Sequence, residues 1–334
     1  MTATRVEWNH EAEEFALNIA RAGSLELMDC YFDAPMPAIS GALRSLFTAA
    51  PGHDLVCSDY SSIEAVVLAE IAGEEWRREV FRTHGRIYEV SAARITGIPF
   101  DPSSKERHPK RKLGKVAELA SGYGGFIGSW KAFGASEFMN DEEIKQAVLA
   151  WRSASPRIVA LWGGQRDGFS GIEGAAIRAV QAPGSEYDYR GISFVVERGV
   201  LMMRLLSGRR IAYHAPELKP STRRYGELSL SFMGWNTNPK NGAKGWVRMD
   251  TYGPRLVENI VQATARDIQR HGIVNLERAG YPIVLHVYDE NVAEVKEGVG
   301  SVEEFESIMS AMPPWCADWP VLARGGWRGK RYRK

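Results

Sequence analysis

The chain lacks the features that mark secreted, disulfide-stabilised and membrane-spanning proteins. Its 3 cysteines among 334 residues are too few and too scattered for a disulfide scaffold or a zinc site. No run approaches the roughly 18 apolar residues that a membrane span needs, and glutamates interrupt the start, where a signal peptide would lie. We therefore expect a protein of a reducing cytoplasm without membrane association.

A strong charge of one sign is also missing, since 42 basic residues stand against 41 acidic ones. A net charge of +1 neither supports nor excludes a nucleic-acid partner, because local patches matter more than the sum. Two basic patches lie at residues 105–115 and 324–334. The second patch is either a solvated, frayed terminus or a contact surface, and both interpretations stay open.

Acidic side chains stand at the ends of two strand-like runs. An apolar run ends at Asp59, and apolar residues at helical spacing follow at once, which predicts a sharp strand-to-helix turn. Asp289 and Glu290 lie between two short β-type runs in residues 283–295, which predicts a hairpin. Carboxylates held at such tips ligate hard cations such as Mg²⁺. If the two tips meet in space, they favour two-metal phosphoryl transfer.

A helix expected at residues 110–123 carries Arg111, Lys115, Leu119 and Tyr123 at four-residue spacing. Four residues advance a helix by about 400°, so the four side chains share one face. Two cations one turn apart can grip a polyphosphate, and an aromatic ring can stack on a base. The alternative is a solvated basic face with Tyr123 packed in a core and glycines that only end the helix.

Two further patterns have a structural and a functional interpretation. Ser61 and Glu64 fit a capping box at the start of the helix after Asp59, although the Glu64 carboxylate can also face a cleft. A polar stripe with helical spacing is either a solvated face or a row of donors for nucleic acid. Its members are Arg255, Asn259, Gln262 and Arg266.

The remaining pattern indicates a mixed α+β fold. We expect helices at residues 79–95, 255–270 and 302–309. Residues 171–245 are rich in Gly, Pro, Ser and Tyr, and we expect loops there with β-like pieces at 192–197 and 209–214.

Several of these segments together resemble the family A DNA polymerases. SDYSSIEAVVLAEIAGE at residues 58–74 resembles motif A of that family, the Arg111 to Gly124 pattern resembles motif B, and VYDE at 287–290 resembles motif C. RLVENIVQATARD at 255–267 and the ending GGWRGKRYRK are similar to the bacteriophage branch. The resemblance covers residues 39–334.

The resemblance implies a small antiparallel palm sheet that carries Asp59 and Asp289 on adjacent strands, flanked by helices, with mostly helical fingers inserted. The implied bounds are an N-terminal helical segment at 1–38, a first palm part at 39–78, fingers at 79–244, and a second palm part with a basic tail at 245–334.

The implied activity is transfer of a nucleotide from a dNTP to the 3′-hydroxyl of a primer on template DNA, with two Mg²⁺ ions or Mn²⁺ as a substitute. The resemblance assigns roles residue by residue. Asp59, Asp289 and the Tyr60 carbonyl hold the metals, with Glu290 beside them; Arg111 and Lys115 bind the triphosphate, and Lys115 is a candidate proton donor; Glu64 excludes a ribose 2′-hydroxyl; Ser61, Leu119 and Tyr123 contact the nucleotide; Gly124, Arg255, Asn259, Gln262 and Tyr288 contact DNA.

The chain also departs from the family pattern. Val66 stands where the family usually has Arg, Tyr288 replaces a His before the motif C acid, and Leu119 replaces a common Phe. Asn259 and Gln262 are three positions apart where cellular relatives use four. Arg209 lies in a Ser-Gly-Arg-Arg turn that also resembles the family, without an assigned role.

Only 58 residues precede Asp59, and no TGR-type segment occurs among them. The resemblance therefore implies that the thumb and exonuclease parts reside on a second polypeptide, in the cytoplasm of a phage-infected host; a truncated piece is the other explanation. The alternative function is a non-catalytic nucleic-acid-binding or assembly subunit.

Overall fold

The structure is a computed structural model that describes residues 10–32, 35–165, 168–221, 226–237 and 244–332. It divides into two compact units. The first comprises Met1–Ser61, His271–Ala311 and Leu322–Lys334, and the second comprises Ser62–Arg270 and Met312–Val321. The four subdomain bounds expected from the sequence differ from these and stay a prediction.

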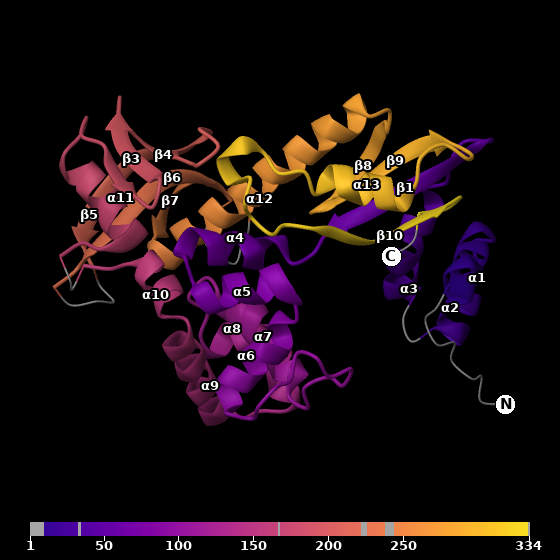
Figure 1. Ribbon diagram of the computed structural model, residues 1–334, viewed down its shortest axis with the longest axis horizontal. Helices are drawn as coiled ribbons and strands as arrows, with labels where there is room; N and C mark the ends of the chain where they lie inside the picture. Colours follow the sequence, from indigo (N-terminus) through magenta and orange to yellow (C-terminus); the bar gives the residue numbers. More distant parts are fainter. Residues whose placement is uncertain (1–9, 33–34, 166–167, 222–225, 238–243, 333–334) are drawn as a thin grey trace. The chain divides into compact units, whose positions relative to one another are not determined.

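The elements are labelled in Figure 1. The helices are α1 (His10–Arg21), α2 (Leu25–Tyr31), α3 (Pro35–Ala42), η1 (Leu43–Leu46), α4 (Ile63–Ala72), α5 (Glu75–Thr83), α6 (Ile87–Thr96), α7 (Arg111–Ser121), α8 (Ile127–Ala132), η2 (Ala135–Glu137), α9 (Asp141–Ala154), α10 (Pro156–Trp162), α11 (Gly171–Gln181), α12 (Gly253–Arg278), α13 (Val302–Met309) and η4 (Pro314–Cys316). The strands are β1 (His53–Tyr60), β2 (Tyr187–Tyr189), β3 (Ile192–Glu197), β4 (Val200–Arg204), β5 (Arg210–Pro220), β6 (Leu228–Asn236), β7 (Gly245–Thr251), β8 (Ile283–Val287), β9 (Glu290–Lys296) and β10 (Ala323–Gly329).

The first unit is built on a four-stranded antiparallel sheet in the order β10–β1–β9–β8. Alternate residues of β1 point to opposite faces. On one face, the Ser58 hydroxyl donates to Glu306 at 3.0 Å and the Tyr60 hydroxyl donates to the Met309 carbonyl at 2.9 Å. Both acceptors belong to α13, which therefore covers this face of the sheet (Figure 1).

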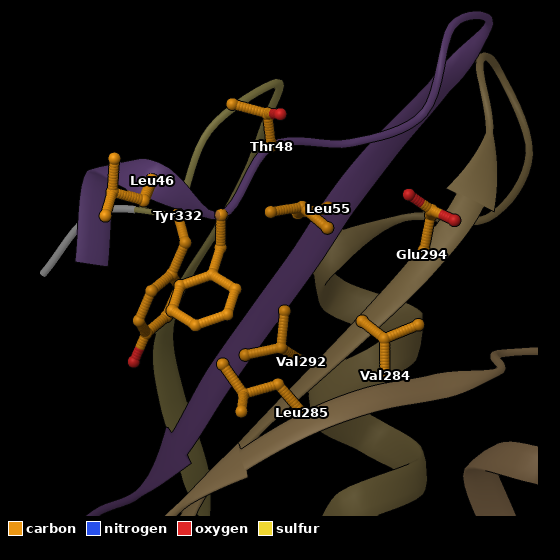
Figure 2. Close-up of a pocket in the computed structure, with 9 residues that line it drawn as sticks. Leu46, Thr48, Leu55, Val284, Leu285, Val292, Glu294 and Tyr332 are labelled. Atoms are coloured by element: carbon orange, nitrogen blue, oxygen red, sulfur yellow. The ribbon is translucent and has the colours of Figure 1, made fainter. Parts of the chain in front are cut away.

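The opposite face of the same sheet carries an apolar cluster of Leu55, Cys57, Val292 and Tyr332. A pocket of about 310 Å³ opens beside this cluster. Figure 2 shows Leu55, Val292 and Leu285 on the strands, with the Tyr332 ring beside them. Helices α1 to α3 form a separate small core of their own, which consists of Ala12, Ala16, Leu17, Ile19, Met28, Phe32, Ala38 and Ala42.

The second unit combines helices α4 to α11 with a six-stranded antiparallel sheet in the order β2–β3–β4–β5–β6–β7. The β-like pieces expected at residues 192–197 and 209–214 are confirmed as β3 and the start of β5, whereas the loops expected in the rest of 171–245 were wrong for most of that stretch, which forms α11 and this meander. The glycines there make tight turns: Gly191, Gly199 and Gly208 have φ of 80°, 76° and 83°. Glycine adopts this left-handed conformation without steric cost, so a glycine-rich composition is compatible with a continuous meander.

Most of the other elements expected from the sequence are present, but one expected helix is divided. The single helix expected at residues 79–95 is two helices, because Gly85 adopts φ 68° between α5 and α6. The hairpin at 283–295 and the helix at 302–309 are confirmed. The mixed α+β class is confirmed as well. Within the described ranges, none of the helices is long and apolar enough to cross a membrane.

The buried guanidinium of Arg77 contacts several helices of the second unit. Arg77 is 2% exposed, forms an ion pair with Glu118 of α7, and donates to Ser155 at 2.9 Å. Its guanidinium carbon lies 4.3 Å and 4.9 Å from the ring centres of Trp76 and Trp151. A buried charge is tolerated only when it is paired and hydrogen-bonded, so this contact ties α5, α7 and α9 together.

Candidate active site

Asp59 and Asp289 are 230 positions apart (289 − 59) and lie at the same end of the four-stranded sheet. Strand β1 runs antiparallel to β9, and Asp59 stands directly opposite Glu290. Opposed antiparallel residues have Cα atoms about 4.5–5.5 Å apart, and consecutive Cα atoms are about 3.8 Å apart. The Cα atoms of Asp59 and Asp289 therefore lie within about 9 Å of each other. Both aspartates are half-buried.

Strand β1 is irregular at Asp59. Its register against β10 shifts between Cys57 and Asp59, and Asp59 stands opposite Arg324 there. A bulge of this kind bends the strand and re-aims a side chain, and bulges are frequent beside active sites. The irregularity lies on the β10 side of Asp59, whereas the pairing of Asp59 with β9 is regular.

Left-handed backbone flanks both acidic tips. Ser62, just after β1, has φ 52°, and Tyr288, just before Asp289, has φ 53°. A bulky residue in this region is an outlier that costs of order 1–3 kcal/mol, and such outliers gather at functional sites. Tyr288 is also 89% exposed at the tip of the β8–β9 turn.

Glu290 differs from the two aspartates in its surroundings. It is 2% exposed, and its carboxylate accepts hydrogen bonds from the Cys57 thiol at 2.7 Å and from the Tyr332 hydroxyl. Burial raises the pKa of Tyr332 above its usual value, and the Glu290 carboxylate raises it further. The sequence pattern pointed to neither contact.

The basic C-terminal segment is part of the sheet. Its first residues form β10, Arg328 and Lys330 contact Asp54 at 2.8 Å and 2.7 Å, and the Arg331 guanidinium donates to the Ser45 carbonyl. The Lys330 contact, followed by the Arg328 contact, holds the pKa of Asp54 below its usual value. A frayed terminus, one of the two interpretations left open, is therefore wrong for residues 323–332.

Helix α7 presents the expected face. Lys115 and Leu119 are exposed, and Lys115 forms no ion pair with any described residue, whereas the Arg111 Nε donates to Glu89 at 2.9 Å. Helix α7 packs closely on α6, because a Cβ on Gly114 would lie 1.9 Å from the Tyr88 carbonyl oxygen. Arg111 contacts α6 through Glu89, whereas Lys115 and Leu119 lie on the exposed part of the same face.

The capping box expected from Ser61 and Glu64 does not form. Helix α4 begins at Ile63, and the residue before it, Ser62, is left-handed and makes no side-chain cap. The Glu64 carboxylate instead accepts a hydrogen bond from the Tyr123 hydroxyl at 2.7 Å. Burial raises the pKa of Tyr123, and the charge of Glu64 raises it further. The structure thus joins two residues that the sequence treated separately.

Helix α12 holds the polar stripe. The Asn259 amide donates to the Tyr213 hydroxyl at 2.8 Å, and burial raises the pKa of Tyr213 to about 12. Gln262 is exposed. Arg209 contacts Asp267 at 2.7 Å and donates to the Ala263 carbonyl, so its family-like turn is bound to α12.

Val66 and Gly124 are both closely packed. Val66 is 1% exposed, so the departure from a family arginine places an apolar side chain in the core. A Cβ on Gly124 would lie 2.7 Å from Pro254, so the segment that follows α7 packs against the start of α12. Among the described residues, no group of three or more His, Cys, Asp or Glu side chains is gathered as a metal site.

Several known DNA polymerases are similar to this chain. No family model matches the chain. It is 39% identical over 311 residues to the DNA polymerase of Bacillus phage SP02, which covers 93% of this chain and 46% of that protein. It is 24% identical over 295 residues to DNA polymerase I of Pseudomonas aeruginosa, over 85% of this chain and 25% of that protein. Among solved structures, the polymerase domain of Pol1 from M. smegmatis, in complex with DNA primer-template and dNTP, matches with a TM-score of 0.54 at 19% identity, over 88% of this chain and 42% of that chain.

The fold is that of a polymerase domain, as the structural match shows. The sequence matches show that this chain is homologous to DNA polymerases, so the resemblance inferred from the motifs is confirmed. The chain spans about half the length of the phage SP02 relative, 46%.

Proposed function

We propose that the chain is the catalytic part of a template-directed DNA polymerase, which adds nucleotides from dNTPs to the 3′-hydroxyl of a primer. The single observation that carries the proposal is the β1–β9 register, which sets Asp59 opposite Glu290 and therefore beside Asp289. The homology to DNA polymerases supports the same conclusion from an independent direction.

Asp59 and Asp289 are the residues that would hold Mg²⁺, or Mn²⁺ in its place, with the Tyr60 carbonyl as a further ligand. The residues fit this ion, because Mg²⁺ is usually bound by one or two carboxylates and completes its shell with water and substrate phosphates. Two bound ions supply Lewis-acid stabilisation of the charge on the transferring phosphoryl group. The two half-buried carboxylates remain accessible for this role.

The cations of α7 would bind the triphosphate. Lys115 is exposed and offers a point charge, and Arg111 is oriented by Glu89, which leaves its terminal guanidinium nitrogens for phosphate oxygens. Lys115 is also the candidate proton donor to the leaving pyrophosphate. Leu119 lies on the same exposed face. Leu119 and Tyr123 would pack against the nascent base pair, and Ser61 is a further proposed nucleotide contact.

Primer-template DNA would contact a further set of polar side chains. Gln262 is exposed on α12, Asn259 is held by Tyr213, and Tyr288 projects from the β8–β9 turn. These side chains can donate to groove edges or sugars, whereas Arg255 would contact phosphate and Gly124 would let the backbone approach the template.

A second candidate is a non-catalytic nucleic-acid-binding or assembly subunit. The observation that favours it is Val66, a buried apolar residue at a position where the family usually carries a charge. Retention of both aspartates and of the α7 cations opposes it, since a subunit without catalysis has no need for them.

Replacement of Asp59 or Asp289 by Asn tests the proposed activity. Each change removes a negative charge from the metal site while it keeps the side-chain size. Stabilisation by the metals amounts to several kcal/mol, so we expect kcat for primer extension to fall by about a thousandfold or more. Circular dichroism and the melting temperature check the fold.

The matched control is Asp101→Asn in the exposed loop before α7, because its side chain only caps Ser103. This variant should extend primers like the parent protein. Normal extension by the Asp59 and Asp289 variants would contradict the assignment and favour the non-catalytic candidate.

Replacement of Glu64 by Ala tests sugar selection. The Tyr123 hydroxyl holds the Glu64 carboxylate, and removal of that carboxylate should leave room for a ribose 2′-hydroxyl. We expect the preference for dNTP over rNTP, measured as the ratio of kcat/KM values, to fall at least tenfold, about 1.4 kcal/mol. Tyr123→Phe should produce a smaller fall, because the ring stays and only the contact to Glu64 is lost.

Glu142→Ala, an exposed glutamate at the start of α9, serves as the control and should leave the ratio unchanged. An unaltered ratio in Glu64→Ala would leave Glu64 as a hydrogen-bond partner of Tyr123 without a role in sugar selection.

We further propose that the thumb and exonuclease functions come from a second polypeptide, in the cytoplasm of a phage-infected host. The match covers 46% of the phage SP02 relative, so a large part of that polymerase lies outside the match. A polymerase without those parts makes fewer phosphate contacts, and its DNA affinity should fall steeply with salt.

The test adds, as a separate polypeptide, the part of the phage SP02 polymerase that lies outside the match. We expect longer extension products and weaker salt dependence than with this chain alone. The same addition to the Asp59→Asn variant controls for activity of the added polypeptide. Identical product lengths with and without it would refute the partner proposal.

A further inference from the structure

Both oxygens of the Glu290 carboxylate accept hydrogen bonds from the apolar face of the sheet. The Cys57 thiol donates to Oε1 at 2.7 Å, and the Tyr332 hydroxyl donates to Oε2. Cys57 and Tyr332 are each 1% exposed. A carboxylate is seldom buried unless hydrogen bonds compensate its lost hydration. These two donors therefore determine where the Glu290 side chain lies.

Tyr332 is itself held in place independently of Glu290. Its backbone N–H donates to the Phe47 carbonyl at 2.9 Å. Its ring centre lies 6.5 Å from that of Phe47 in an edge-to-face arrangement and 6.0 Å from that of Trp327. Cys57 is equally fixed, because it lies within the paired part of β1 opposite Val292. Two rigid donors thus reach the same carboxylate from the C-terminal segment and from β1.

The position of Glu290 has direct consequences for the two aspartates. Glu290 is the first residue of β9, follows Asp289 in the chain and stands opposite Asp59. The turn before it is strained, with Tyr288 at φ 53°. A strained turn persists only where its surroundings over-determine it. The anchored Glu290 side chain is one such determinant, since it fixes the residue at which the turn re-enters the sheet.

We infer that Tyr332 and Cys57 are positioning residues, which hold the Glu290 carboxylate on the apolar face and thereby set Asp289 against Asp59 for metal binding. The inference rests on the proposed function and deepens it. The C-terminal segment then helps to position the metal ligands. Glu290 orients the site, and the two aspartates bind the ions.

Tyr332→Phe is the direct test, because it removes the hydroxyl donor and keeps the ring. Residues that orient metal ligands typically change metal affinity or activity by about 10–100-fold when they are replaced. We expect Mn²⁺ binding, measured by titration calorimetry without DNA or dNTP, to weaken by about that factor. In primer extension, kcat should fall while the KM for dNTP stays within about twofold, because the proposed triphosphate-binding cations lie on α7.

Further variants distinguish a specific effect on metal binding from a general loss of folding. Cys57→Ala removes the second donor and should weaken Mn²⁺ binding, whereas Cys57→Ser keeps a donor and should restore it. Tyr281→Phe is the matched control, because Tyr281 is a buried tyrosine of the same unit whose hydroxyl donates to a different carboxylate, Glu304, at 2.6 Å. It should leave Mn²⁺ affinity unchanged even if it lowers the melting temperature.

A double-mutant cycle distinguishes action through Glu290 from a separate effect. If Tyr332 works through the carboxylate, Tyr332→Phe should change Mn²⁺ affinity little in a Glu290→Gln background, so the two changes are not additive. Fully additive effects would contradict the inference.

The outcomes separate the two claims. Wild-type protein that neither binds Mn²⁺ nor extends primers refutes the proposed function and this inference with it. Wild-type protein that does both, with Tyr332→Phe and Cys57→Ala variants that match it in Mn²⁺ affinity and kcat, refutes this inference alone.

Discussion

The antiparallel register of β1 against β9 is the constraint on which the candidate site depends. It pairs Asp59 with Glu290 and so carries Asp289 to the same end of the sheet. A slip of one residue would turn every side chain of a strand to the opposite face. The register must therefore be specified strongly for two acids so distant in sequence to act together.

Both faces of the sheet contribute to this specification. On one face, Ser58 and Tyr60 bond to α13, and on the other, Leu55 and Cys57 join the apolar cluster with Val292. A slipped β1 would turn the apolar set toward α13 and leave the buried Ser58 and Tyr60 hydroxyls without their partners, which costs free energy. The packing that stabilises the first unit is thus the same packing that aligns its acidic residues.

The sequence predicted those parts of the site that depend on local periodicity. Asp59 ends the apolar run that forms β1, and Asp289 follows the run that forms β8, with β9 between the two strands in the sheet. The Arg111–Lys115–Leu119 face follows from helical spacing. It did not predict that Glu64 bonds to Tyr123 or that Tyr332 reaches Glu290, because these contacts join segments through tertiary packing that leaves no spacing signal. Two strands of the six-stranded meander, β3 and β5, were expected, but the others were missed because the glycines, read as loop formers, serve tight hairpin turns.

Metal-directed backbone cleavage tests the central claim most directly. Fe²⁺ placed in a Mg²⁺ site with ascorbate and peroxide generates short-lived radicals, which cut the chain only near the bound ion. The account predicts two cuts in the same molecule, one beside Asp59 and one beside Asp289, both suppressed by excess Mg²⁺ and both lost in the Asp59→Asn variant. Cleavage beside only one of the two aspartates, or cleavage beside Asp289 that persists in that variant, would contradict a shared metal site.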